Sequence, residues 1–325
     1  MTAATPPDLS ILIVNYNGGP LLARCLASLP DAAAGRAFEV IVVDNASSDD
    51  SLRLVEQSLP QGPWLTVVRR PDNAGFAAAT NQAASLSRGS QLLLLNPDTE
   101  CHAGAIRSLA EHLDAHPEVG AVGPCLLNAD GSAQRSAWRG WPGLGSALVD
   151  ALYVWKWIEL PGMRALQTRL PEQGSDPVAT PQTLDVDHLL GACILIPRPV
   201  WQRVGPLDEG YFLFLEETDW CRRARHAGYR IAQLPAAMVH HGQHSVYQVP
   251  EQSSPSYYRG YLRFVRRAGA GSLRLLLLRG ILAAGILIRL LLWTLRLAGG
   301  RRALARRMLR GYVAALRVVA APGAG

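Results

Sequence analysis

The sequence predicts an α/β protein with a mostly parallel central sheet, helices on both faces of that sheet, and a C-terminal amphipathic helical tail. Three observations support this fold class. Short apolar segments alternate with helical segments through the first half of the chain, polar turn residues follow each apolar segment, and the C-terminal part is both basic and apolar. Continuous apolar strands joined by helical crossovers form parallel sheets that are covered on both faces.

Four apolar segments have the length and composition of buried strands, and helical segments separate them. The predicted strands of the first half are residues 10–15, 39–44, 65–69 and 91–95. The predicted helices are residues 21–29, 51–58 and 77–87, with a further possible helix at 144–158. Later in the chain we expect strand-like structure at 184–197, a helix within 208–228 and a strand at 229–234.

Composition limits the classes of protein that the chain can belong to. It has 325 residues, of which 49% are apolar, so it can bury the core of one large domain with an appendage. The five cysteines are odd in number and none forms a CxxC pair, which argues against a disulfide framework or a zinc knuckle and favours a reducing compartment. Residues 1–14 lack the basic region and the long apolar run of a signal peptide.

Charge is distributed unevenly along the chain. Residues 252–325 contain 14 arginines and no lysine, aspartate or glutamate, whereas the whole chain has a net charge of +6. The chain is therefore an acidic body followed by a basic tail. Such a tail favours an anionic membrane surface or nucleic acid as a partner, and the scarcity of aromatic residues in it argues against nucleic acid.

The apolar segment 273–298 of the tail is interrupted by Arg274, Arg279, Arg289 and Arg296. Its longest stretch without arginine is nine residues, well below the roughly 20 that cross a bilayer. Each central arginine would cost about 2.5–3.5 kcal/mol to insert. We therefore expect a helix that lies in the membrane interface. The alternative is a helix packed on the preceding domain with its arginines in solvent.

Four polar clusters follow the predicted strands, at the sheet edge where open α/β folds bind ligands. The clusters are Asn15-Tyr16-Asn17-Gly18, residues 44–49, residues 70–76 and Asn96-Pro97-Asp98-Thr99. Asn, Asp, Gly and Ser are also ordinary turn residues, so one cluster alone would be weak evidence. A carboxylate at such a position is suited to accept hydrogen bonds from a ribose or base, or to hold a divalent cation against phosphate oxygens.

These clusters and their strands resemble the N-terminal half of glycosyltransferase family 2, in the segments ILIVNYNGG, VIVVDNASSDDS, RRPDNAGFAAATNQA and LLLLNPDT. The segment DHLLGACILIPRPVWQRVGPLDEGYFLFLEETDWCRRARHAGYRI resembles the acceptor side of the rhamnosyltransferase-like branch of bacterial surface-polysaccharide enzymes. The resemblance covers residues 8–247. It implies a Rossmann-like GT-A fold, a nucleotide-sugar donor, a divalent metal and inversion at the anomeric carbon.

The resemblance also implies how the chain is divided into domains. It implies a GT-A catalytic domain over residues 1–250, with a nucleotide-sugar-binding half at about 1–130 and an acceptor-binding half at about 131–250. Residues 251–325 then form the basic amphipathic tail. The cysteine pattern, the lack of signal-peptide features in residues 1–14 and the basic tail together predict a cytoplasmic enzyme that is held peripherally on the inner face of the cell membrane.

Donor-binding roles carry over by motif position. The implied nucleotide-sugar-binding residues are Asn15, Asn17, Asp44, Asn45, Ser47, Asn73, Gly75, Asn96 and Asp98. Asn96-Pro97-Asp98 matches the DxD-type signature with its first Asp replaced by Asn, so Asp98 is the carboxylate expected to bind Mg²⁺ or Mn²⁺. The alternative for Asp98 is a turn-forming residue after proline.

Catalytic roles are implied for the acidic cluster that opens the predicted helix within 208–228. We expect Glu217 to be the base that takes the proton of the acceptor hydroxyl, with Glu216 as the second choice. Asp219 is expected to orient the acceptor or Arg222. The alternative is that these acids only complement the dipole of the helix N-terminus.

Further roles are implied in the second half of the chain. In the pattern His240-x-Gly242-x-x-Ser245, His240 is expected to bind the metal or the diphosphate in preference to His241, although a structural hydrogen bond is the common role of a histidine. The implied acceptor-binding residues are His188, Gly191, Asp208 and Glu209, and the last two are equally consistent with a turn.

The expected function is transfer of a sugar, rhamnose or a related hexose, from a nucleotide diphosphate donor to a lipid-linked or polysaccharide acceptor in cell-envelope glycan synthesis. The branch resemblance favours dTDP-rhamnose as donor and a glycan or polyprenyl-linked acceptor, with no nucleic acid partner. A sugar nucleotidyltransferase would need a basic phosphate loop after its first strand, and Asn15–Gly19 is followed by no Lys or Arg before Arg24. A non-catalytic membrane-associated scaffold or glycan-binding protein is the other alternative.

Overall fold

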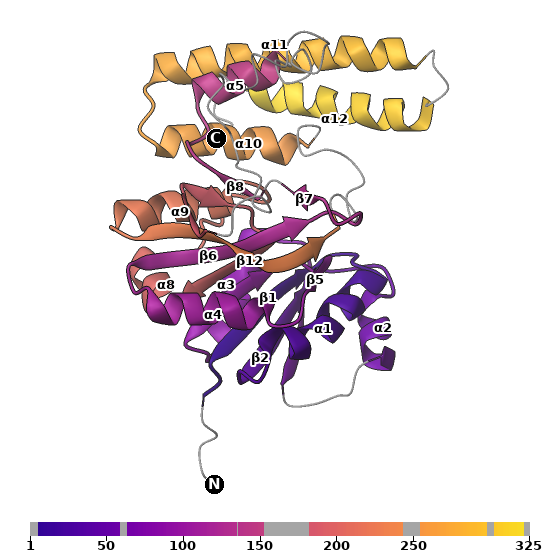
Figure 1. The fold of residues 1–325 in the computed structure, drawn as a ribbon. Helices are drawn as coiled ribbons and strands as arrows, with labels where there is room; N and C mark the ends of the chain where they lie inside the picture. The colour runs from indigo at the N-terminus through magenta and orange to yellow at the C-terminus, as the bar shows by residue number, and fades with distance from the viewer. Residues whose placement is uncertain are drawn as a thin grey trace. The chain divides into compact units, whose positions relative to one another are not determined.

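The computed structural model describes residues 6–58, 64–134, 136–152, 182–242, 254–297 and 302–321 (Figure 1). Contacts between residues divide the chain into two compact units, which we call the sheet unit and the helical unit. The sheet unit comprises Met1–Arg139, Gly174–Gly210 and Glu216–Val246. The helical unit comprises Gly140–Gln173, Tyr211–Leu215 and Tyr247–Gly325.

The sheet unit is built on a 10-stranded sheet. Its main strand order is β3 (Leu65–Arg69), β2 (Phe38–Asp44), β1 (Leu9–Asn15), β4 (Gln91–Leu95), β11 (Cys193–Pro197), β6 (Val119–Leu127), β12 (Arg230–His241) and β5 (Thr99–Cys101). The short strands β7 (Ala133–Gln134) and β9 (Leu184–Val186) pair with β6 and β12. β8 (Ala137–Trp138) and β10 (His188–Leu189) form a separate antiparallel pair.

Strand directions confirm the predicted mostly parallel sheet. β3, β2, β1 and β4 are mutually parallel, and β12 is parallel to β6. β11 runs antiparallel to both β4 and β6 and so joins the two parallel parts. Every residue of β1 and β4 is buried, as expected for strands that are covered on both faces.

Helices alternate with these strands (Figure 1). They are α1 (Pro20–Ala33), α2 (Ser51–Ser58), α3 (Phe76–Leu86), α4 (Ala105–Ala115), α8 (Arg198–Val204) and α9 (Glu216–His226). The predicted elements of the first half agree with the structure to within a few residues at their ends. α4 and β6 were not among them, because β6 (VGAVGPCLL) carries two glycines and a proline, residue types that are depleted in strands.

The helical unit contains α5 (Leu144–Ala151), α10 (Pro255–Arg267), α11 (Ser272–Arg296) and α12 (Arg302–Ala320), drawn together in Figure 1. Its core joins aromatic residues of α10 to leucines of α11 and to Met308 and Tyr312 of α12. Close contacts between elements require small residues. A Cβ at Gly285 would lie 2.8 Å from Ala151 Cα, and one at Gly260 would lie 2.8 Å from the Phe214 carbonyl oxygen.

The predicted tail is thus part of a larger unit that also includes α5, which packs against α11. α5 ends at Ala151, and the remainder of the helix predicted to reach residue 158 lies outside the described residues. The predicted domain boundary near residue 250 lies outside them as well.

A buried ion pair connects α5 to α11. Arg289 is 3% exposed, and its Nη2 donates to the backbone oxygen and to Oδ1 of Asp150, both at 2.9 Å. Nη1 of the same guanidinium donates to the Gly285 carbonyl at 3.2 Å. Burial raises the pKa of the Asp150 carboxyl, and the neighbouring Arg289 opposes that rise. The pair therefore fixes the face of α11 that carries Arg289 against α5.

We predict that Asp150→Ala lowers the free energy of unfolding by about 2–3 kcal/mol, because it leaves the buried Arg289 charge without its carboxylate. Chemical denaturation followed by circular dichroism measures this change. The double variant Asp150→Ala/Arg289→Met should recover most of the loss, since it removes the stranded charge. Arg310→Met, at an exposed position on α12, is the matched control and should change stability by less than about 0.5 kcal/mol. Equal stability of Asp150→Ala and the wild type would show that the Asp150–Arg289 ion pair does not stabilise the fold.

Candidate active site

The carboxyl ends of β1 and β2 are linked by a buried asparagine. Asn15 Nδ2 lies 2.8 Å from Asp44 Oδ1, 3.1 Å from Ser47 Oγ and 2.8 Å from Ser51 Oγ. Asp44 Oδ2 also accepts from the Ser47 backbone N–H at 3.2 Å. Asn15 and Asp44 are both buried. Together these contacts fix the position of the Asp44 carboxylate, which the resemblance assigns to the nucleoside.

Asn17 holds the loop after β1 against the loop after β2. Its backbone N–H donates to Ser47 Oγ at 2.9 Å, and its Oδ1 accepts from the Ser48 backbone N–H at 2.8 Å. Asn17 has a φ of +53°, a region that asparagine enters more readily than most residues. The structure therefore brings Asn15, Asn17, Asp44 and Ser47 together, as predicted.

A second asparagine organises the loop before α3. Asn45 Nδ2 donates to Asn73 Oδ1 at 2.8 Å and to the Gly75 carbonyl at 3.1 Å, while its Oδ1 accepts from the Ala74 N–H at 3.2 Å. Gly75 precedes α3 with a φ of +87°, which glycine adopts without strain. The predicted residues Asn45, Asn73 and Gly75 thus form one connected group at the N-terminus of a helix, where backbone N–H groups favour anions.

His241, and not His240, lies beside Asp98. The distance from His241 Nε2 to Asp98 Oδ1 is 3.6 Å, and to Asn96 Nδ2 it is 3.5 Å. The Asp98 and His241 side chains are 9% and 10% exposed. His240 Nδ1 instead lies 3.1 Å from the Asn128 carbonyl oxygen, and its ring packs against His102. The structure therefore places His241 closer to Asp98 than His240, because neighbouring residues of β12 point to opposite faces. Metal or diphosphate binding by His240 stays a prediction.

The hydrogen bonds around His241 fix the orientation of its ring. His241 Nδ1 is 2.7 Å from Gln134 Oε1, and Gln134 Nε2 donates to Asn128 Oδ1 at 3.2 Å. Because an amide oxygen only accepts, Nδ1 of His241 carries the proton. Nε2 of the ring is then turned toward Asp98 Oδ1, 3.6 Å away. Metal-binding histidines are commonly oriented in this way by a partner on the other ring nitrogen.

Two residues of the β10–β11 connection join the Asn96–Asp98 loop to α9. The Asn96 N–H donates to the Ala192 carbonyl at 2.9 Å. At the preceding residue, a Cβ on Gly191 would lie 3.3 Å from Glu217 Cγ. Gly191, predicted to bind the acceptor, therefore provides the space that Glu217 occupies.

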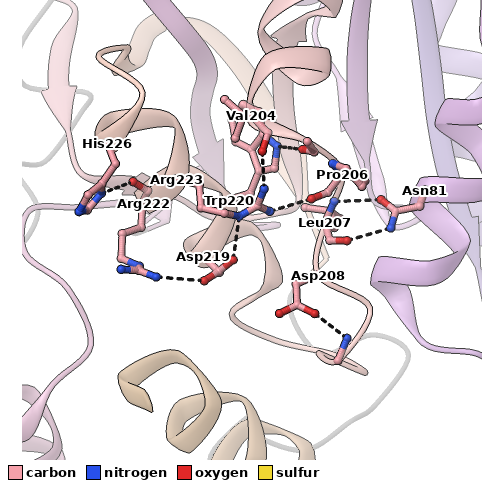
Figure 2. A network of polar contacts seen from close by, with 12 residues as sticks. Asn81, Val204, Pro206, Leu207, Asp208, Asp219, Trp220, Arg222, Arg223 and His226 are labelled. Atoms are coloured by element: carbon pink, nitrogen blue, oxygen red, sulfur yellow. Dashed lines mark hydrogen bonds and ion pairs between the residues drawn. The ribbon is translucent and has the colours of Figure 1, made fainter. Parts of the chain in front are cut away.

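The three acids of α9 have different surroundings. Glu216 is buried, while Glu217 is partly exposed and its Oε1 accepts from Thr218 Oγ1 at 3.3 Å. Asp219 is fully buried and pairs with Arg223 at 2.9 Å and Arg222 at 3.6 Å (Figure 2). Asp219 thus meets the predicted partner Arg222, and a role in orienting the acceptor stays a prediction. Exposure favours Glu217 as the acid that reaches a substrate.

The turn after α8 holds the predicted residues Asp208 and Glu209. Asp208 Oδ1 accepts from the Gly210 N–H at 2.9 Å, and Glu209 Oε1 accepts from Asn81 Nδ2 at 2.9 Å. Asn81 also bonds both backbone groups of Leu207, and Arg223 donates to the carbonyls of Val204 and Pro206 (Figure 2). These contacts favour the turn interpretation. Acceptor binding by the pair stays a prediction.

His188 is covered by an aromatic ring. It lies under Trp138 with ring centroids 5.0 Å apart and an interplanar angle of 6°. His188 is buried and Trp138 is partly exposed. Trp138 is therefore the more accessible of the two for a sugar ring, and the predicted acceptor contact of His188 stays a prediction.

Four residues of the site were not foreseen. Gln134 orients His241, Asn81 and Arg223 hold the 204–209 turn, and Ala192 receives the Asn96 N–H. Gln134 and Ala192 act through local contacts that no motif marks. An arginine four residues after Asp219 on one helix was the only available signal for Arg223.

The sheet topology and the polar residues at its carboxyl edge fit the GT-A fold, and solved structures share this fold. The chain superposes on GalNAc-T7, solved with UDP, GalNAc and Mn²⁺, with a TM-score of 0.57 and 18% identity, over 81% of this chain and 48% of that one. It superposes on the mannosyltransferase PcManGT of Pyrobaculum calidifontis, solved with GDP-Man and Mn²⁺, with a TM-score of 0.53 and 18% identity, over 96% and 86% of the two chains.

Sequence comparison gives the family. The family described as "Glycosyl transferase family 2" matches residues 10–170, and the chain belongs to it. The chain is 29% identical to the N-acetylglucosaminyl-diphospho-decaprenol L-rhamnosyltransferase of Mycobacterium tuberculosis, over 85% of this chain and 90% of that one. It is 25% identical to a low-salt glycan biosynthesis hexosyltransferase of Haloferax volcanii, over 80% and 74% of the two chains.

We predict that Gly191→Val lowers the rate of sugar transfer by about tenfold or more, since a displacement of roughly 1 Å in a reacting group costs up to about 100-fold. The added methyl groups would push Glu217 aside. Affinity for a nucleoside diphosphate, measured by calorimetry, should stay unchanged. Gly145→Val is the matched control, because a Cβ at Gly145 meets nothing within 4 Å. Full activity of Gly191→Val would show that Glu217 needs no such space.

Proposed function

We propose that the protein is a metal-dependent inverting hexosyltransferase that moves rhamnose or a related sugar from a nucleotide diphosphate to a saccharide on a polyprenyl diphosphate. One observation supports the chemistry most directly. The loop that carries Asp98 and the helix that carries Glu217 are joined through Gly191 and Ala192. A candidate metal ligand and a candidate base therefore belong to one connected site.

Asp98 and His241 fit a divalent cation that is shared with the donor. They offer a carboxylate oxygen and an oriented imidazole nitrogen, and the described residues contain no group of three or more His, Cys, Asp or Glu side chains placed to enclose a metal. Mg²⁺ and Mn²⁺ commonly take their remaining ligands from substrate phosphates and water. When bound, the cation would neutralise charge on the departing diphosphate. The carboxylates at the strand ends would meet the nucleoside.

Glu217 would act on the acceptor. Its carboxylate takes the proton of the acceptor hydroxyl while that oxygen bonds to the anomeric carbon, and the bond from this carbon to the diphosphate oxygen breaks on the opposite face. The configuration is thereby inverted. The similar protein of Mycobacterium tuberculosis is an N-acetylglucosaminyl-diphospho-decaprenol L-rhamnosyltransferase, which supports the proposed acceptor class and rhamnose as the transferred sugar.

A donor screen by nucleotide release tests this function. With Mg²⁺ or Mn²⁺ and a polyprenyl-diphosphate saccharide, we expect dTDP-rhamnose to be turned over faster than UDP- or GDP-sugars. Glu217→Gln should lower transfer by about 10²–10⁴-fold, the usual contribution of a general base, with the donor still bound. Glu111→Gln, on the exposed surface of α4, should have no effect. Release of no nucleotide from any donor would contradict the proposal.

Variants of the two neighbouring histidines distinguish a specific loss of metal binding from a general loss of structure. His241→Ala should weaken the Mn²⁺-dependent binding of thymidine diphosphate by about tenfold or more, while binding without metal changes little. His240→Ala is the matched control and should leave the metal dependence intact. Isothermal titration with and without Mn²⁺ measures both. A larger effect from His240→Ala would show that His240, and not His241, binds the metal.

A further inference from the structure

α11 presents an uncharged apolar face to solvent. Among the described residues it is the one helix that is long and apolar enough to cross a membrane by length and composition. Its exposed large side chains follow helical spacing on one side of the helix. They are Leu273, Leu276, Leu277, Leu287, Ile288, Leu291, Leu292 and Leu295, with exposures from 39% to 71%. We call these eight residues the leucine face.

The central arginines of α11 lie on the packed side of the helix. Arg279 Nη1 donates to the carbonyls of Val319 and Ala321, at 2.6 and 2.7 Å, and Arg289 is held by Asp150 on α5. This differs from the alternative of a packed helix with its arginines in solvent, although Arg274 and Arg296, near the two ends of α11, are exposed. The inward bonds of Arg279 and Arg289 leave the middle of the leucine face without a charged side chain.

Exposed arginines occur on the neighbouring helix, α12. Arg302, Arg306, Arg310 and Arg317 are all exposed, and residues 252–325 contain no acidic residue. Soluble surfaces rarely leave so long an apolar stripe uncovered, and such stripes mark interaction sites. A partner that offers both hydrocarbon and negative charge is complementary to this unit.

From these contacts we propose that the leucine face inserts into the surface of an anionic lipid bilayer, with α11 parallel to the membrane plane. Crossing the membrane would require Arg279 and Arg289 to leave their partners and enter lipid, at about 2.5–3.5 kcal/mol each. Lying in the plane keeps both hydrogen-bonded inside the helical unit. The inference rests on the helical unit alone and does not depend on the proposed sugar transfer.

Vesicle flotation of the full chain tests this surface. We expect binding to vesicles of phosphatidylcholine with phosphatidylglycerol, and much less to phosphatidylcholine alone. Leu287→Gln/Leu291→Gln should weaken binding by about tenfold or more, because two inserted leucine side chains are lost. Val67→Gln/Leu86→Gln, at exposed apolar positions outside α11, is the matched control and should bind normally. Circular dichroism confirms that each variant is folded.

Four results would overturn the inference. Unchanged vesicle binding by Leu287→Gln/Leu291→Gln would show that the leucine face does not contact the bilayer. A dimer that this variant dissociates, in a protein that does not bind vesicles, would show that a second copy covers the face. Retention in the bilayer after alkaline extraction would show that α11 crosses it. Arg306→Gln/Arg310→Gln should lower binding to anionic vesicles only, and equal binding to both vesicle types by the wild type would contradict the role of charge.

Discussion

The site depends on the hydrogen bond from the Asn96 N–H to the Ala192 carbonyl, at the end of the β4–β11 pair. β4 is the last of the four parallel strands that follow one another from the sheet edge, and β11 is the antiparallel strand that follows it. The loop after β4 carries Asp98, and the residues before β11 adjoin Glu217. Antiparallel pairing places the end of one strand beside the start of the next, so this register brings the two carboxylates into one site.

Much of the donor side could be predicted because its information is local. The end of each buried strand is visible as a change from apolar to Asn, Asp, Gly and Ser, and parallel pairing takes these ends to one edge. Asn15, Asp44, Asn45 and Asn73 meet there in the structure. Their hydrogen bonds are mostly to one another, so the sequence indicated the location better than it indicated what each side chain contacts.

The sequence offered the least guidance where long-range register decides which residues meet. The choice between His240 and His241 depends on which face of β12 each occupies, and an irregularity between Leu234 and Met238 interrupts the simple alternation. In the tail, the direction of Arg289 depends on Asp150, a residue 139 positions away. Periodicity along α11 gave the two faces correctly, but no local pattern showed which of them is packed.

The central claim is that Asp98 and His241 hold a divalent cation beside a nucleoside diphosphate. Anomalous diffraction from crystals grown with Mn²⁺ and thymidine diphosphate tests it directly. A manganese peak in contact with Asp98 and His241 Nε2, with diphosphate oxygens among its other ligands, is the predicted result. A peak bound by His240, or a nucleotide bound away from the carboxyl ends of β1, β2 and β4, would contradict the account.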